Sequence, residues 1–170
     1  CEELAALLAE QPDDTSALRY LADLWDRLGA PLQAGPLLRR LGELASTSDE
    51  RAEYGLRACM MFLAGDDIDT AQEVLDDVAP LAQRESVIEL RVELARRRGD
   101  GRALSESLEQ LAASSREPAD RRAAILVAAE RAASALGAAA LALDRVRRAQ
   151  RLSPGAADAV LEARRLEYKL

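Results

Sequence analysis

A glycine that closes an apolar helical run recurs along this chain at a nearly constant interval. Gly29, Gly65, Gly99 and Gly137 are separated by 36, 34 and 38 residues. The run before the first of them places its apolar side chains on one helical stripe, at Leu18, Leu21, Ala22, Trp25 and Leu28. Glycine closes a helix end without steric cost because it can adopt a positive φ. A unit of helix, glycine and helix, repeated at this period, restricts the fold to stacked helix pairs.

The helix after Gly29 has an apolar stripe of its own, at Ala34, Leu37, Leu38 and Leu41. Pro31 suits the first turn of this helix, where the missing N–H would have no partner in any case. Neither helix can bury its stripe alone, so the two must pack together and then against neighbouring pairs. These patterns predict an all-α chain.

The same reasoning along the chain predicts the bounds of each helix. Thr47 and Glu50 have the spacing of a capping box, and Asp13 and Asp14 offer an earlier N-cap. Pro36 either kinks the second helix of the first pair or moves its start from Pro31 to about Gln33. We predict helices over residues 2–11, 15–28, 31–41, 46–64, 87–98, 102–114, 118–136 and 138–152, one from about Ala71 that ends near residues 80–83, and a last one from Pro154 to the C-terminus.

These motifs resemble the tetratricopeptide repeat (TPR) family. That family has large, large, small and aromatic residues in its first helix, then glycine, then two alanines around an apolar residue, then proline. The first unit matches with Leu18, Leu21, Ala22, Trp25, Gly29, Ala34, Leu38 and Leu41, and Pro12 closes the helix before it. The fourth unit matches with Leu126, Ala129, Gly137, Ala142, Val146, Ala149 and Pro154. The middle units depart from the pattern, since the seventh position of the motif is Arg57 in one and Arg91 in the other.

The resemblance implies a right-handed α-solenoid of about ten antiparallel helices in one domain, residues 1–170. Its parts would be a partial repeat 1–14, repeats at about 15–48, 49–84, 85–117 and 118–154, and a terminal helix 155–170. We expect the chain to be part of a longer protein with further repeats, because it opens inside what resembles the second helix of a repeat. An alanine-, arginine- and leucine-rich, lysine-poor composition is associated with GC-rich bacterial genomes, so we expect a bacterial origin.

Two related repeats fit less well. Pentatricopeptide repeats have a similar length but bind RNA, which requires a basic groove, whereas this chain has a formal charge of −7 and no nucleic-acid partner is expected. Repeats of the HEAT type have a period of roughly 40–47 residues, longer than the period found here.

The sequence contains no pattern that is typical of a catalytic site. The chain has no histidine, which removes the commonest metal ligand and general base, and no glycine loop of the phosphate-binding type. Asp66, Asp67 and Asp69 lack the alternate spacing of a calcium loop and are expected to serve the turn and the N-cap of the next helix. Cys59 is expected to pack as a small apolar residue rather than to act as a reactive thiol. We therefore expect no enzyme activity, no cofactor and no metal.

Basic and terminal residues leave other interpretations open. Arg96, Arg97, Arg98 and Arg102 could bind an anion or an acidic peptide, but positive charge at a helix C-terminus more simply complements the helix dipole. No apolar run is long enough to span a membrane, and a cytoplasmic location is expected. Cys1 leaves a periplasmic lipoprotein as the alternative.

The resemblance also implies a function. TPR proteins bind an extended peptide or a helix of a partner protein on the concave face, and we expect the same of this chain. The family's groove positions correspond to candidate partner-binding residues Arg19, Asp23, Arg27, Cys59, Phe62, Leu63, Glu89, Glu93, Arg96 and Arg131. The expected ligand has an apolar anchor near Phe62 and a basic residue near Glu93. A structural spacer or a regulatory segment of a larger multidomain protein is the alternative, and self-association through exposed terminal repeats stays open.

Overall fold

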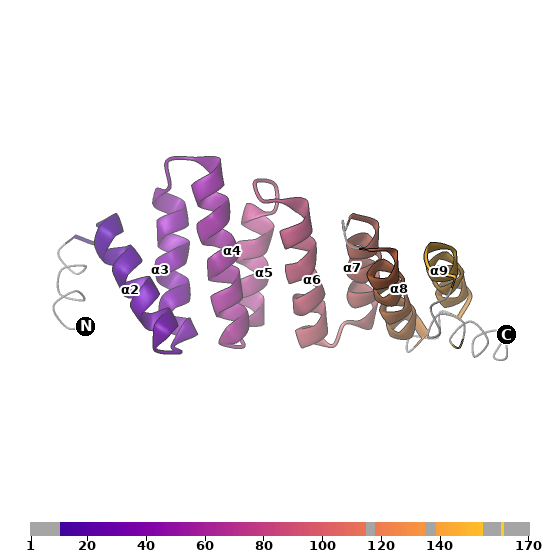
Figure 1. The fold of residues 1–170 in the computed structure, drawn as a ribbon. Coiled ribbons are helices and arrows are strands. Elements are labelled where there is room, and N and C mark those ends of the chain that lie inside the picture. The colour runs from indigo at the N-terminus through magenta and orange to yellow at the C-terminus, as the bar shows by residue number, and fades with distance from the viewer. Residues whose placement is uncertain (1–10, 115–117, 135–138, 155–160, 162–170) are drawn as a thin grey trace. The chain divides into compact units, whose positions relative to one another are not determined.

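The computed structural model describes residues 11–114, 118–134, 139–154 and 161. Within these residues the chain forms helices and no strand, which confirms the predicted all-α class (Figure 1). The predicted helices over 2–11 and beyond Pro154, the turn at Gly137 and most of the terminal residues expected to self-associate lie outside the described residues. The helices are α2 (Thr15–Arg27), α3 (Pro31–Leu44), α4 (Ser48–Ala64), α5 (Ile68–Val78), α6 (Arg84–Arg98), α7 (Gly101–Ser114), α8 (Ala119–Ser134) and α9 (Ala139–Leu152).

Short polar side chains start several helices where the sequence predicts them. The Asp14 carboxylate accepts hydrogen bonds from the first backbone N–H groups of α2. The Thr47 hydroxyl accepts one from the Glu50 N–H at 3.2 Å, as the capping-box spacing predicts. Asp67 caps α5 in the same way, which is the turn and N-cap role expected of this acidic group. α3 begins at Pro31 and continues through Pro36, so the alternative start near Gln33 is wrong.

The recurring glycine has different roles at different turns. Gly29 and Gly99 both adopt a φ of +67°, a region that favours glycine. Gly65 has a φ of −86°, and the left-handed residue of its turn is Asp66, with a φ of 62°. A Cβ atom on Gly65 would lie 2.4 Å from Cδ2 of Leu32. This glycine therefore leaves room for the Leu32 side chain of α3, and its own backbone conformation does not favour glycine.

The Cα positions divide the chain into two compact units, Cys1–Leu90 and Arg91–Leu170. In the first unit, α3 packs against α2 and α4, and α4 packs against α5; consecutive helices run in opposite directions (Figure 1). Trp25 is only half-buried and Leu28 is exposed, so the apolar stripe of α2 is incompletely covered at its end. The core of the first unit includes Leu18, Leu21, Ala22, Ala34, Leu38, Leu41, Val74 and Leu75. The organisation of residues 1–170 as a single repeat domain stays a prediction.

Two helical glycines allow the helices of the first unit to approach closely. A Cβ on Gly35 would lie 3.0 Å from the ring of Phe62, and one on Gly55 would lie 2.3 Å from Cγ1 of Val78. Real Cβ atoms essentially never make contacts as short as the second. The α4–α5 contact therefore depends on the absence of a side chain at residue 55.

In the second unit, α8 packs against both α7 and α9. Apolar side chains from these helices and Val92 of α6 form two clusters, one around Leu126 and one around Leu108. This unit also buries polar side chains, namely Ser105, Ser107, Arg145 and Ser153.

Candidate protein-binding surface

Helices α2 and α4 bring four polar side chains together on one surface. Arg19 Nε donates a hydrogen bond to the Tyr54 hydroxyl at 3.0 Å. Arg57 pairs with the Asp23 carboxylate at 2.9 Å. Arg19 and Asp23 lie one turn apart on α2, and Tyr54 and Arg57 lie one turn apart on α4. We call this set of four residues the α2–α4 face; its two helices are the first helices of successive predicted repeats.

The groups of the α2–α4 face remain accessible to a ligand. The side chains of Arg57 and Asp23 retain 32% and 45% of their exposure. A partly exposed ion pair contributes only about 0–1 kcal/mol. A partner could therefore replace these contacts with its own at small cost. Arg27, a further candidate, is exposed one turn beyond Asp23 on α2.

The three apolar candidates are not on any open face. Cys59, Phe62 and Leu63 are 0%, 5% and 4% exposed, so their expected place on a binding groove is wrong. The reason is that α4 packs against α3 and α5 and must bury two adjacent stripes rather than one. The Phe62 ring fills the space over Gly35 on α3. Cys59 instead meets the expectation of a small apolar core residue, and burial raises the pKa of its thiol to about 12.

The acidic candidate Glu93 has partners within its own helix, α6. The Glu93 carboxylate pairs with Arg96 at 2.7 Å and with Arg97 at 3.0 Å. Its charge is therefore largely compensated before any ligand arrives. Glu89 on α6 is exposed, and so is Arg131 on α8. The ten candidates thus include two sets that the structure brings together: Arg19 and Asp23 beside α4, and Glu93 with Arg96.

Sequence reasoning missed Tyr54 and Arg57 as members of the surface. A signal existed, because Arg57 occupies a motif position where the TPR pattern has a large apolar residue. An arginine at such a position requires an acceptor nearby, and Asp23 on the neighbouring first helix supplies it. Asp100 has a local role instead: its carboxylate accepts hydrogen bonds from the Arg102 and Ala103 N–H groups at the start of α7.

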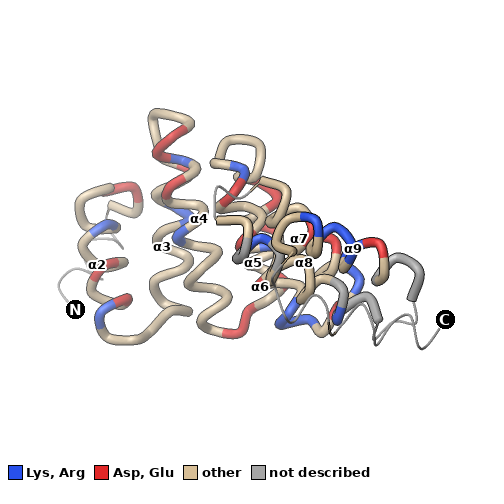
Figure 2. Tube along the Cα trace, turned by 45° about the vertical axis from the view of Figure 1, so that its right-hand side comes forward, with Lys and Arg blue, Asp and Glu red and all other residues tan. Residues whose placement is uncertain are grey.

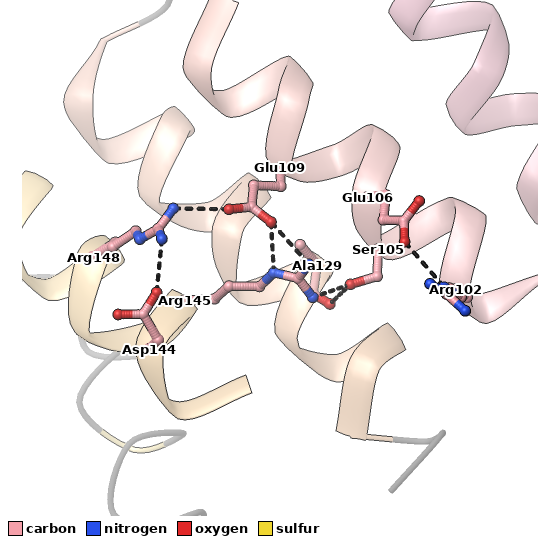
Figure 3. A network of polar contacts seen from close by, with 8 residues as sticks. All are labelled: Arg102, Ser105, Glu106, Glu109, Ala129, Asp144, Arg145 and Arg148. Atoms are coloured by element: carbon pink, nitrogen blue, oxygen red, sulfur yellow. Dashed lines mark hydrogen bonds and ion pairs between the residues drawn. The ribbon is translucent and has the colours of Figure 1, made fainter. Parts of the chain in front are cut away.

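A buried polar network joins the helices of the second unit (Figure 3). Arg145 on α9 is 2% exposed and binds Oε2 of Glu109 on α7 through Nε at 3.0 Å and Nη2 at 2.8 Å. Its Nη1 donates to the Ser105 hydroxyl, and that hydroxyl donates to the Ala129 carbonyl on α8 at 2.8 Å. Arg148 binds the other oxygen of Glu109 at 2.8 Å. Side chains from α7 and α9 and the backbone of α8 therefore form one connected network.

Comparison with protein-family models finds no match for this chain, and comparison with curated proteins finds none either. Among the described residues, no helix has the length and apolar character needed to cross a membrane. In the same part of the chain, no three His, Cys, Asp or Glu residues gather closely enough to hold a metal ion.

Proposed function

We propose that this chain is a non-enzymatic protein-interaction module whose α2–α4 face binds an extended peptide or a helix of a partner protein. In this proposal the helix pairs stack as a right-handed, TPR-like solenoid and the first helices line its concave face. The contacts between Arg19 and Tyr54 and between Asp23 and Arg57 support it most, because they join the first helices of two successive predicted repeats. The contact between Glu109 and Arg145 supports the same stacking, since it joins the second helices of the next two predicted repeats.

The chemistry of the face suits a ligand with polar groups of both kinds. Its guanidinium groups and the Tyr54 hydroxyl can donate hydrogen bonds, and the Asp23 carboxylate can accept them. An extended peptide exposes backbone N–H and C=O groups that match such a mixture. The corrected position of Phe62 removes the apolar anchor from the expected ligand, which leaves polar recognition as the basis of the proposal.

A structural spacer or a regulatory segment of a larger protein is the alternative. One observation favours it: the four residues of the α2–α4 face already pair with each other, so the surface is complete without a ligand. Under this alternative the face serves to hold α2 against α4.

Charge reversal on the face distinguishes the two functions. The chain, an Arg19→Glu/Arg57→Glu variant and an Arg39→Glu/Arg51→Glu control would each be used to capture partners from a lysate of the source organism. The two variants change the net charge equally, but the control residues lie outside the face. Partners held by the chain and the control, and lost by the face variant, would support the proposal once direct binding is shown with purified components. Partners held equally by all three would overturn it.

Folding must be verified for each variant by circular dichroism. A folded chain that captures no partner would favour the spacer function. Phe62→Ala is not a useful test of binding, because truncating a side chain that is 5% exposed removes core packing and is expected to cost about 3–5 kcal/mol.

A further inference from the structure

A cavity of about 330 Å³ lies among α7, α8 and α9 of the second unit. Ala112 and Leu126 are buried, whereas Arg148 and Arg151 are exposed. The apolar residues therefore form the inner wall, and arginines lie toward solvent. The lining consists of Glu109, Ala112, Ala113, Arg122, Leu126, Arg148, Arg151 and Leu152.

The cavity carries an excess of positive charge. Its one carboxylate, Glu109, is already bound by Arg148 and, from the buried side, by Arg145. Arg148 also pairs with Asp144 at 2.9 Å, so among the described residues of the lining the positive charge without a carboxylate partner is that of Arg122 and Arg151. Arg122 donates from Nε to the carbonyl oxygen of Ala112 at 2.9 Å, an acceptor without a formal charge. No hydrogen bond or ion pair of Arg151 is found within the described residues.

This positive charge contrasts with the rest of the chain. The whole molecule has a formal charge of −7, yet α9 contains four arginines and a single acidic residue, Asp144 (Figure 2). In the first unit, α5 has the opposite composition, with four acidic residues and no basic one. The arginines of the cavity are thus a local feature that general solubility of an acidic protein does not require.

We propose that this cavity binds a short acidic segment of a partner protein. One apolar side chain of the segment packs against Leu126 and Leu152, and flanking carboxylates bind Arg122 and Arg151. Arginine suits this role because its planar guanidinium can bind a carboxylate through two parallel hydrogen bonds. A basic segment would be repelled, and a wholly apolar one would remove the guanidinium groups from water without compensation.

This site is separate from the α2–α4 face, because it is formed by α7, α8 and α9 of the other unit. It does not rest on the function proposed above. An arginine in the last turn of a helix also complements the helix dipole, as Arg151 does in α9. If Arg151 had that role alone, the chain would show no preference for a peptide with an apolar residue among its acidic residues. The experiment therefore measures this preference.

The test uses the full chain and a fluorescein-labelled peptide with a central leucine flanked by glutamates on both sides. Fluorescence anisotropy would measure its affinity, beside a peptide with glutamine in place of glutamate and one with glycine in place of leucine. We expect the first peptide to bind more tightly than both others, and its affinity to fall as salt is raised.

Arg151→Glu is the variant that tests the charge of the site. It replaces an attraction by a repulsion and should weaken binding about tenfold. Arg102→Glu is the matched control: it makes the same charge change on α7, but Arg102 lies outside the cavity and its side chain is 84% exposed beside Glu106. The control should bind the peptide as the unmodified chain does.

A second variant, Ala113→Phe, fills the cavity from an exposed position without truncating the core. It should also weaken binding, with an unchanged circular dichroism spectrum. The proposal is overturned if no saturable binding is detected, if the glycine peptide binds as well as the leucine peptide, or if both variants bind like the unmodified chain. Binding that is lost in the Arg19→Glu/Arg57→Glu variant instead would assign the peptide to the α2–α4 face.

Discussion

The two units bring their helices together with different interface chemistry. In the first unit, Gly35 and Gly55 allow the neighbouring helix to approach until Phe62 and Val78 occupy the space of a missing side chain. In the second unit, the buried side chain of Arg145 crosses between helices and binds Glu109 and Ser105. The buried polar side chains of the described residues all belong to the second unit.

This difference shows that the residues that give the chain its helical repeat pattern are not the residues that determine how neighbouring helices contact each other. Both units have apolar stripes of helical period, which is why the same pattern predicts helices in both. The glycine contacts of the first unit tolerate no added volume, because a packed interior has little free space. The network of the second unit tolerates no lost partner, because an unpaired charge in the interior is costly. Substitutions should therefore destabilise the two units for different reasons: added volume in the first and a lost polar partner in the second.

The largest effect is expected from Glu109→Ala. This change leaves the Arg145 guanidinium, which is 2% exposed, without its carboxylate. Breaking a buried pair in this way costs about 3 kcal/mol or more. Arg145→Met should cost less, because Glu109 retains Arg148 and is itself 29% exposed. Urea unfolding of the full chain and both variants measures the two changes.

The prediction depends on the order of the two losses in free energy of unfolding: Glu109→Ala should destabilise the protein more than Arg145→Met. If Arg145→Met destabilises the protein more than Glu109→Ala, then the guanidinium contributes more through its other hydrogen bonds, such as that to Ser105, than through its pairing with Glu109. The carboxylate would then not be the partner on which the buried arginine depends.

Gly55→Ala and Gly42→Ala should change stability in opposite directions. Both glycines lie in helices of the first unit and line the same small cavity. A Cβ on Gly55 would meet Cγ1 of Val78 at 2.3 Å, whereas the nearest atom to one on Gly42 is 3.6 Å away, an ordinary contact. Overpacking costs about 1–3 kcal/mol, and alanine gains up to about 1 kcal/mol over glycine in a helix.

Gly55→Ala is therefore expected to destabilise the protein by about 1 kcal/mol net, and Gly42→Ala to stabilise it by up to about that amount. Thermal unfolding followed by circular dichroism gives both signs. A stabilising Gly55→Ala would mean that α5 moves away easily, and the close approach of α4 and α5 would not be a constraint on the sequence.

Much of the helical structure could be predicted from local residue patterns. Thr47 at a capping position, Asp14 before α2 and Gly29 after it mark helix ends through contacts within a few residues. Such contacts can be inferred from the sequence because they do not depend on the rest of the fold. Gly65 shows the limit of local patterns: it recurs at the expected interval, but Asp66 adopts the positive φ of this turn, and the neighbour of Gly65 in space is Leu32 of α3.

The candidate surface is harder to predict from the sequence. The apolar stripe of a helix shows which side chains are buried, but it does not show which other helices pack against it. Phe62 was expected on an open face, because a motif position was assigned without knowing that α4 packs on both sides. No local pattern marks Arg145, because its carboxylate partner, Glu109, is 36 residues away in the sequence. Contacts at this separation depend on which helices are adjacent, and that is a property of the fold.

The ion pair between Asp23 and Arg57 should be much weaker than the pair in the second unit. Both of its side chains are partly exposed, at 45% and 32%. A double-mutant cycle with Asp23→Ala and Arg57→Ala should give a coupling free energy below about 1 kcal/mol. A coupling as large as that of Glu109 and Arg145 would show that α2 and α4 also depend on a polar contact, and the α2–α4 face would then be primarily structural.

The smallest effect is expected on the alkylation rate of Cys59 in the Glu109→Ala variant. This rate tests whether the two units unfold independently. Its thiol is fully buried in α4, and burial raises its pKa to about 12, so it cannot react with an alkylating reagent at neutral pH until α4 opens. Glu109→Ala removes contacts that lie within the second unit. If each unit unfolds on its own, the labelling rate of Cys59 in this variant should match that of the unmodified chain, as followed by mass spectrometry of its peptide. A rate that rises in proportion to the lost free energy of unfolding would show one cooperative transition. Leu38→Ala, which truncates a core side chain of the first unit, should accelerate labelling in either case and is the positive control.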